Sequence, residues 1–310
     1  MMTGATMSEV LILNEREVES LLDMRECIAA MEEALAALAR GEVFNPLRNV
    51  ARAPAAPGFL GLMPAWRGGE RPAWGLKEVC VYPGNPKRGL DTHLGAVLLH
   101  SGETGELIGV FNASAITAIR TAAVSAVATK LLARDDAKTL AIIGTGVQGR
   151  SHLRAIPLVR DLRDVRVVGR NDDIEAAVRV ADIVVLATNA REPIIKRDWL
   201  KPGVHINAVG SSIASTREVD TETMATASLF VDRRESTVNE SGDYLLALKD
   251  GAKVEIRGEI GELLLGGKGR SSVDEITLFK SLGLAIEDLA SAQLLYDKAA
   301  REGVGTRVEF

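Results

Sequence analysis

One stretch constrains the fold more than any other: the apolar run TLAIIGTG, residues 139–146, which passes directly into a glycine-rich turn. Gly144, Gly146 and Gly149 form the pattern G-x-G-x-x-G, and a helical pattern follows at once. In such a unit the first glycine permits a tight turn, the second lets a pyrophosphate approach the backbone, and the third lets helix and strand pack closely. The stretch therefore predicts a dinucleotide-binding unit, with a plain strand-to-helix turn as the alternative.

The chain beyond this unit alternates between strands and helices. Four further apolar runs follow, separated by helical or polar segments: VRVVGR at 165–170, ADIVVLAT at 181–188, VHINAVG at 204–210 and SLFVD at 228–232. Continuous apolar strands are typical of sheets covered on both faces, and alternation with helices indicates parallel pairing. We therefore predict an α/β fold with a Rossmann-type, doubly wound parallel sheet.

The part of the chain before this sheet has a different pattern. Three strand-like runs occupy residues 74–83, 93–100 and 106–112. The turn sequence SGETG joins the last two, which indicates antiparallel pairing. An alanine-rich helix follows from Ser114 or Thr117, and residues 281–305 form one long amphipathic helix suited to packing on this first part. We predict two domains: a smaller α+β domain of residues 1–119 with 280–310, and a Rossmann domain of residues 120–279.

Composition excludes several classes of partner. The net charge of −5, from 37 basic and 42 acidic side chains, leaves no basic excess for nucleic acid or an anionic membrane surface. Cys27 and Cys80 lie far apart and the four histidines lack ligand spacing, so we expect neither disulfides nor a metal site. Residues 1–14 lack the pattern of an export signal, and no apolar run approaches the roughly 18 residues of a membrane span. We expect a cytoplasmic protein with a small-molecule partner.

The residues expected to contact the dinucleotide follow the ends of the strands. They are Gly144, Thr145, Gly146, Val147, Gln148 and Gly149 in the glycine-rich turn, Arg170 and Asn171 after the second strand, Thr188 after the third, and Val209, Gly210 and Ser211 after the fourth. NAD sites usually place Asp or Glu after the second strand, whereas an Arg there can accept the 2′-phosphate of NADP. Arg170 therefore favours NADP, and NAD is the alternative if Asp172 or Asp173 turns towards the ribose.

The spacing of these strands is unusual. Only roughly 38 residues separate Gly144 from the strand at 181–188, which leaves room for one strand where a full nucleotide-binding half carries two. A strand and a helix are therefore missing after Arg170. Either the sheet is truncated there, or the sequence omits a disordered stretch.

Seven separated motifs together resemble the ornithine cyclodeaminase and mu-crystallin family. They are NPLRNVAR, LMPAW, GLKEV, AITAIRTAAVSA, GTGVQGRSH, INAVGSS with REVD just after, and DEITLFKSLGLAIEDLASA, in order over nearly the whole chain. The resemblance implies a homodimer whose first domain, completed by the C-terminal helix, mediates dimerisation and binds the substrate. It also implies that the substrate is an amino acid or a cyclic imino acid.

Three cations match the residues that surround the substrate carboxylate in that family: Arg48, Lys77 and Arg120. Arginine can bind a carboxylate through two parallel hydrogen bonds, and lysine acts as a point charge that titrates when buried. Arg120 lies in an apolar helical stretch where an unpaired charge would be costly, so we expect an anionic ligand as its partner. A salt bridge is the alternative for each cation, and Arg52 is a rival to Arg48.

Lys77 is also the candidate catalytic proton donor. Arg48 and Arg120 nearby would lower the pKa of Lys77 towards neutrality, so that it could protonate the substrate nitrogen. Carboxylate binding alone is the alternative role.

Two departures from the family pattern bear on the reaction. Cyclodeaminating members carry an Asp just beyond the AVG strand, where this chain has Ser211 and Ser212 and no carboxylate before Glu218. They also carry a Glu ahead of the Met-Pro step, which FLGLMP lacks. Serine offers no charge to an ammonium group and is a poor base. We therefore expect NAD(P)H-dependent hydride transfer to a cyclic ketimine, such as a pyrroline or piperideine carboxylate, or amino-acid dehydrogenation. Ornithine cyclodeamination with NAD is the first alternative, and a mu-crystallin-like protein that binds NADP and a small ligand is the second.

Overall fold

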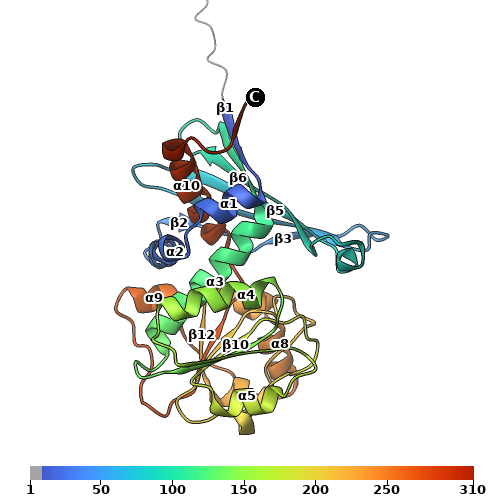
Figure 1. The fold of residues 1–310 in the computed structure, drawn as a ribbon, viewed down its shortest axis with the longest axis vertical. Helices are drawn as coiled ribbons and strands as arrows, with labels where there is room; N and C mark the ends of the chain where they lie inside the picture. Colours follow the sequence, from blue (N-terminus) through green and yellow to red (C-terminus); the bar gives the residue numbers. More distant parts are fainter. Residues whose placement is uncertain (1–8) are drawn as a thin grey trace, which may run out of the picture. The chain divides into compact units, whose positions relative to one another are not determined.

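The computed structural model describes residues 9–310, which separate into two compact units (Figure 1). Unit 1 contains the described residues up to Ala30, Arg40–Arg120 and Leu284–Phe310, and unit 2 contains Met31–Ala39 and Thr121–Gly283. This division differs from the predicted boundaries mainly in helix α2 (Met24–Ala39), whose second half groups with unit 2. Residues 1–8, where part of the search for an export signal falls, lie outside the described range.

Unit 1 contains an eight-stranded sheet that is antiparallel apart from one pair. Its strands are β1 (Glu9–Leu13), β2 (Val43–Phe44), β3 (Asn49–Ala51), β4 (Phe59–Arg67), β5 (Ala73–Val81), β6 (His93–Ser101), β7 (Leu107–Asn112) and β15 (Thr306–Glu309). They lie in the order β15-β1-β7-β6-β5-β4-β2, with β3 paired to β4 and β1 parallel to β7. The three predicted antiparallel strands are confirmed as β5, β6 and β7. The sequence pattern does not predict β15, because all four of its residues are exposed.

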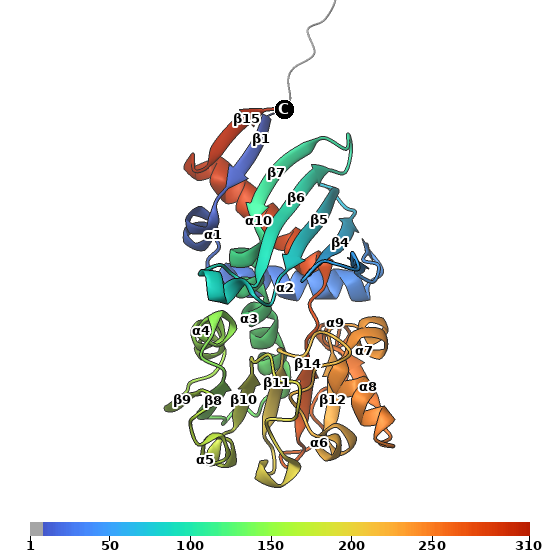
Figure 2. The same cartoon turned by 90° about the vertical axis from the view of Figure 1, so that its right-hand side faces the viewer.

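Helix α10 (Ala285–Glu302) packs on β4 and β5 of this sheet (Figure 2). Its approach is close at Gly75 of β5, where a Cβ atom would lie 2.9 Å from Cβ of Leu289. Residues 285–292 are all buried. The long C-terminal helix predicted from the sequence is therefore confirmed, and its first two turns lie inside the unit. Helix α1 (Glu15–Leu21) follows β1 and begins with a capping box at Asn14.

Unit 2 contains a seven-stranded sheet in which every pair is parallel, as predicted. Its strands are β8 (Thr139–Ile143), β9 (Asp164–Val168), β10 (Ile183–Leu186), β11 (His205–Ala208), β12 (Ser228–Val231), β13 (Ile256–Glu259) and β14 (Thr277–Lys280). Figure 2 shows most of them side by side, and their full order is β13-β12-β14-β11-β10-β8-β9. The five strands predicted from apolar runs are present, whereas β13 and β14 were not predicted. Both are only four residues long, and β14 ends in a charged residue.

Helices cover both faces of the parallel sheet. They are α4 (Val147–Ala155), α5 (Ile174–Val180), α6 (Thr221–Thr226), α7 (Arg234–Glu240), α8 (Gly242–Lys249), α9 (Ile260–Leu264) and the second half of α3 (Ala113–Leu132). Ile143 of β8 and Leu186 of β10 belong to one apolar cluster with Val178 of α5. On β11, Asn207 Nδ2 donates to Thr129 Oγ1 of α3 at 2.9 Å. This two-sided burial explains why the strands are continuous apolar runs.

Strand β9 ends the sheet, and the chain then passes through residues 169–173 directly into α5. The further strand and helix of a full nucleotide-binding half are absent between them. The sheet ends at β9 within the described residues, as both alternatives drawn from the spacing predict for this sequence.

Helix α3 is the one helix within residues 9–310 that is long and apolar enough to cross a membrane. Most of its apolar window is buried inside the protein, and core helices of folded proteins share this composition.

Candidate active site

Two of the predicted cations, Lys77 and Arg120, lie on elements of unit 1 that the fold brings together. On β5, alternate residues from Ala73 to Val79 are buried beneath α10, and Lys77 occupies one of these inward positions. Arg120 lies on the first half of α3 and is also buried. Lys77 and Arg120 each have a relative exposure of 4%, so both charges are held away from solvent.

Two carboxylates on the first turn of α10 pair with these cations. Lys77 Nζ lies 3.3 Å from Asp288 Oδ1, and Arg120 Nε donates to the same oxygen at 3.1 Å. Arg120 Nη1 donates to Glu287 Oε2 at 2.7 Å. The anionic partners of Arg120 in the protein are therefore two acidic side chains from the end of the chain. Sequence reasoning did not identify either of them.

Arg48 belongs to the same electrostatic environment. Burial lowers the pKa of Lys77, Asp288 raises it, and the charges of Arg120 and Arg48 lower it, with the net result a pKa of about 8. Lys77 is thus poised to exchange a proton near neutral pH. The rival cation, Arg52, instead lies over the ring of Phe59, with its guanidinium carbon 4.1 Å from the ring centroid.

In unit 2, the surroundings of each glycine in the predicted turn explain why glycine occupies that position. Gly144 has φ +127°, and a Cβ atom there would lie 2.3 Å from Ala187 O. A Cβ atom on Gly149 would lie 1.8 Å from Gly144 O, so only glycine lets α4 pack at this distance. Gly146 has no atom within 4 Å of its Cβ position, and no side chain caps α4 there. The open backbone at the N-terminus of α4 fits a pyrophosphate.

The other predicted cofactor residues lie on loops beside this turn. We call the turn and these loops together the row of cofactor loops. Strands β9, β8, β10 and β11 are neighbours and parallel, so the residues that follow them share one edge of the sheet. Arg170 and Asn171 follow β9, Thr188 follows β10, and Val209, Gly210 and Ser211 follow β11. In parallel sheets this carboxyl edge is where ligands bind.

The two acidic residues after β9 are engaged locally. Asp172 Oδ2 accepts from Gly169 N at 2.7 Å, and Asp173 Oδ1 caps α5 by accepting from Ala176 N at 2.9 Å. Arg170 is exposed at the same place.

Glu218, whose side chain is fully buried, also lies at this edge and was not among the site residues predicted from the sequence. Its Oε1 accepts from Thr188 N at 2.7 Å and from Thr188 Oγ1 at 2.8 Å, and its Oε2 accepts from Gly210 N at 2.7 Å. Burial raises the pKa of Glu218 to about 7. The only sequence signal was its place in REVD, one of the motifs that carry the family resemblance. Ser211 is also buried, and its hydroxyl donates to Thr216 O.

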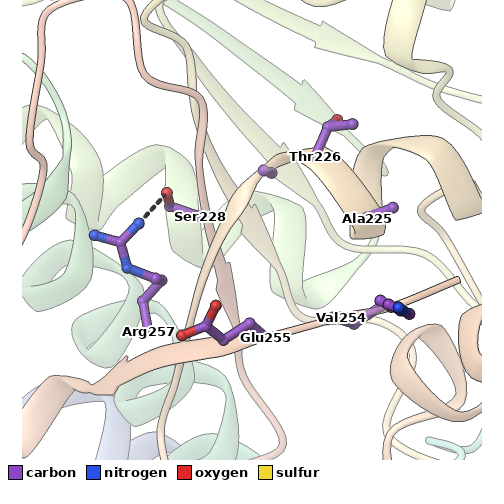
Figure 3. Close-up of a pocket in the computed structure, with 8 residues that line it drawn as sticks. Ala225, Thr226, Ser228, Val254, Glu255 and Arg257 are labelled. Carbon is purple, nitrogen blue, oxygen red and sulfur yellow. Dashed lines mark hydrogen bonds between the residues drawn. The ribbon is translucent and has the colours of Figure 1, made fainter.

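A surface pocket lies elsewhere on unit 2 and contains none of the predicted site residues. Figure 3 shows its lining, and Arg257 Nη1 lies 3.5 Å from Ser228 Oγ within it. The lining residues are Ala225, Thr226, Ala227, Ser228, Lys253, Val254, Glu255 and Arg257. They surround the starts of β12 and β13, at the amino edge of the sheet, so the pocket is not where a parallel sheet binds a dinucleotide.

Comparison with known proteins places the whole chain in one family. The model of the ornithine cyclodeaminase/mu-crystallin family matches residues 8–177 and 168–303. The ketimine reductase mu-crystallin of Mus musculus is 39% identical over 291 residues, covering 87% of this chain and 91% of that protein. The structure of Thermococcus litoralis Delta(1)-pyrroline-2-carboxylate reductase in complex with NADH and L-proline has a TM-score of 0.92 at 38% identity, covering 96% of this chain and 100% of that one. An archaeal alanine dehydrogenase dimer with bound NAD has a TM-score of 0.92 at 34% identity, covering 97% and 99%.

The same comparisons bear on the short connection after β9. The alignment with the mouse protein runs over 291 positions but includes 87% of 310 residues, which is about 270, so about 20 positions have no counterpart here. The family model matches in two segments that meet at residues 168–177, just after β9. The two matched segments thus meet at the short connection between β9 and α5.

We expect the substitutions Gly149→Ala and Gly146→Ala to separate packing from cofactor binding. Gly149→Ala forces a methyl group against Gly144 O and should lower the free energy of unfolding by about 1–3 kcal/mol, measured by denaturant titration. Gly146→Ala meets no neighbouring atom and should change that free energy by less than about 0.5 kcal/mol. It should nevertheless weaken NAD(P)H binding by about tenfold or more, because its methyl group occupies the approach of the pyrophosphate. Unchanged affinity in Gly146→Ala would contradict the assignment of this turn.

Proposed function

This chain belongs to the ornithine cyclodeaminase/mu-crystallin family, and we propose that it is an NAD(P)H-dependent reductase of a cyclic ketimine carboxylate, such as a pyrroline or piperideine carboxylate. The observation that carries this proposal is the buried group of Lys77, Arg120 and Asp288. It offers two cations to a substrate carboxylate and a lysine whose pKa lies near 8. Relatives named as ketimine and pyrroline-carboxylate reductases support it.

In the proposed reaction the chain's own groups bind, orient and protonate the substrate. Arg120 and Arg48 hold the carboxylate, which fixes the orientation of the imine. Lys77, protonated at neutral pH, donates a proton from Nζ to the imine nitrogen. The reduced nicotinamide, when bound through the glycine turn and the row of loops, supplies the hydride. Asp288 keeps the ammonium form of Lys77 favoured in a site where burial opposes it.

Amino-acid dehydrogenation is the second candidate, because the archaeal alanine dehydrogenase is as similar in structure as the pyrroline-carboxylate reductase. Dehydrogenation needs the same binding of the substrate carboxylate and the same exchange of a proton with the substrate nitrogen. Ornithine cyclodeamination is disfavoured by Glu218. This first carboxylate after β11 is buried and already accepts three hydrogen bonds, so it is not available to an amine. A role as a binding protein alone is the remaining alternative, and the substrate panel below distinguishes it from an enzyme.

We propose NADP as the preferred cofactor, with NAD as the alternative. Asp172 and Asp173 each hold a backbone N–H group of the connection between β9 and α5, and this local role supports the choice of Arg170 over an acidic residue as the ribose contact. Arg170 remains exposed after β9 and can pair with a 2′-phosphate.

We further propose that the protein is a cytoplasmic homodimer. The dimeric alanine dehydrogenase supports the assembly. Both cysteines, Cys27 and Cys80, are free thiols, which suits a reducing compartment.

A substrate panel tests the function directly. We expect NADPH oxidation with pyrroline and piperideine carboxylates, and no efficient formation of proline and ammonia from ornithine with NAD. Absorbance at the NADPH band and an ammonia assay measure the two activities. Tight cofactor binding without turnover over the panel would overturn the enzyme proposal, and efficient proline formation would restore the cyclodeaminase.

We expect Lys77→Met to reduce turnover by about 100-fold or more while cofactor affinity stays nearly unchanged. In the wild type, kcat/KM should fall as the pH rises above about 8, because the donor must be protonated and the pKa of Lys77 is about 8. Asp288→Asn removes the charge that raises this pKa, so the fall should begin about one pH unit lower or more. A fall at the same pH in Asp288→Asn, or unchanged turnover in Lys77→Met, would remove Lys77 as the donor.

Arg170→Ala should lower the preference for NADPH over NADH by about tenfold or more, since a charge-assisted contact to phosphate contributes about 1.5 kcal/mol or more. The measured quantity is the ratio of kcat/KM for the two cofactors. Arg166→Ala is the matched control, because Arg166 is also exposed, lies within β9 and pairs with Asp164. A ratio that changes equally in both variants would argue against a specific phosphate contact at Arg170.

A further inference from the structure

Glu218 is a fully buried carboxylate that takes no part in the proposed reaction. It lies between β11 and α6 (Thr221–Thr226), in the segment that returns beneath the row of cofactor loops. Burying a carboxylate costs free energy unless hydrogen-bond donors surround it, so the buried position of Glu218 requires a physical reason.

That reason lies in its three hydrogen bonds. One carboxylate oxygen accepts from the backbone N–H and the hydroxyl of Thr188, at 2.7 and 2.8 Å. The other accepts from the backbone N–H of Gly210 at 2.7 Å. Thr188 follows β10 and Gly210 follows β11, so a single side chain connects two loops of the predicted cofactor row.

The backbone of Glu218 is itself held by a second buried carboxylate. Asp243 Oδ1 accepts from Glu218 N at 2.7 Å and from Val219 N at 3.0 Å. Its other oxygen lies 3.1 Å from Lys280 Nζ, and both side chains are fully buried. Lys280 Nζ also donates to Ala208 O at the end of β11. Elements α8, β14 and β11 thus fix the position from which Glu218 reaches the loops.

We propose that Glu218 is a positioning residue which, only in its ionised form, holds Thr188 and Gly210 in the arrangement that receives the dinucleotide. Cofactor affinity then depends on the protonation of a group that does not touch the cofactor. The inference rests on the proposed function in one respect, namely that Thr188 and Gly210 contact the cofactor.

The direction of the pH dependence follows from the groups around Glu218. Burial raises the pKa of Glu218 to about 7, and Asp243 of α8 raises it too, whereas Lys280 of β14 and the donors of Thr188 lower it. A protonated carboxyl group must donate from one oxygen, so it can no longer accept all three hydrogen bonds. Affinity should therefore be full above about pH 7 and fall as the pH decreases through that value. The two histidines of unit 2 do not interfere, because burial lowers the pKa of His152 to about 4 and of His205 to about 3.

The experiment measures the dissociation constant of NADH for the full-length protein by fluorescence, without substrate, from pH 6 to 8.5. NADH is the probe because it lacks the 2′-phosphate, which titrates in this range, and omitting substrate keeps Lys77 out of the measurement. We expect the dissociation constant of the wild type to rise by about tenfold from pH 8 to pH 6. Glu218→Gln should bind about tenfold more weakly at pH 8, because its amide NH₂ faces N–H donors, and its affinity should not vary with pH.

Asp182→Asn is the matched control. Asp182 is also buried and accepts from two backbone N–H groups, those of Lys138 and Thr139, but at the amino edge of the same sheet. This variant should be less stable than the wild type yet keep the wild-type pH dependence of NADH binding. Loss of the pH dependence in Asp182→Asn as well would overturn the inference, because any buried carboxylate would then suffice.

The outcomes separate the two proposals. If the wild type binds neither NADH nor NADPH at any pH, the proposed function fails. If the wild type binds NADH and Glu218→Gln shows the same pH profile, the function stands and the role of Glu218 is wrong. Should Glu218→Gln not fold, Thr188→Val decides. It removes one donor to the ionised form, so the midpoint of the wild-type transition should move to higher pH. An unmoved midpoint would overturn the inference.

Discussion

The contact of Asp288 with Lys77 and Arg120 is the interaction on which the proposed chemistry depends. Two cations on different elements, β5 and α3, are brought within hydrogen-bonding distance of one carboxylate oxygen. Without that oxygen the buried cations would repel each other, and breaking a buried ion pair typically costs about 3–5 kcal/mol. The close approach of α10 at Gly75 is what delivers Asp288 to this position. The end of the chain therefore completes a site whose cations come from its first 120 residues.

Unit 2 shows a related arrangement in which the donors are neutral. Its loops offer backbone N–H groups, and the organising side chains are again carboxylates, here Glu218 and Asp243. In both units an anion from a distant segment fixes donors that would otherwise be free to move. A preorganised set of donors loses little on binding an anionic ligand, which is the physical advantage of both arrangements.

The sequence was informative where a local pattern has one physical cause. The glycine turn, the apolar strands and the antiparallel pairs were predictable because turn sterics and two-sided burial act on neighbouring residues. Lys77 and Arg120 could be selected only through the family resemblance, since a cation in an apolar stretch also suits a salt bridge. Asp288 was not recognisable, because acidic residues are ordinary in the first turn of a helix and only the fold shows that this turn is buried. Strand β14 was not predicted for a similar reason. Its last residue, Lys280, is a buried charge, and only long-range contacts with Asp243 and Ala208 compensate for that burial.

The truncated sheet leaves β9 with one unpaired side. Its backbone groups on that side have no neighbouring strand among the described residues, and Val165 and Val167 are each 40% exposed. Open strand edges are templates on which other chains add strands and aggregate. Here the edge is only five residues long and carries Asp164 and Arg166, and short, charged edges resist such growth. Asp164 and Arg166 thus protect the open edge of β9 against the addition of strands from other chains.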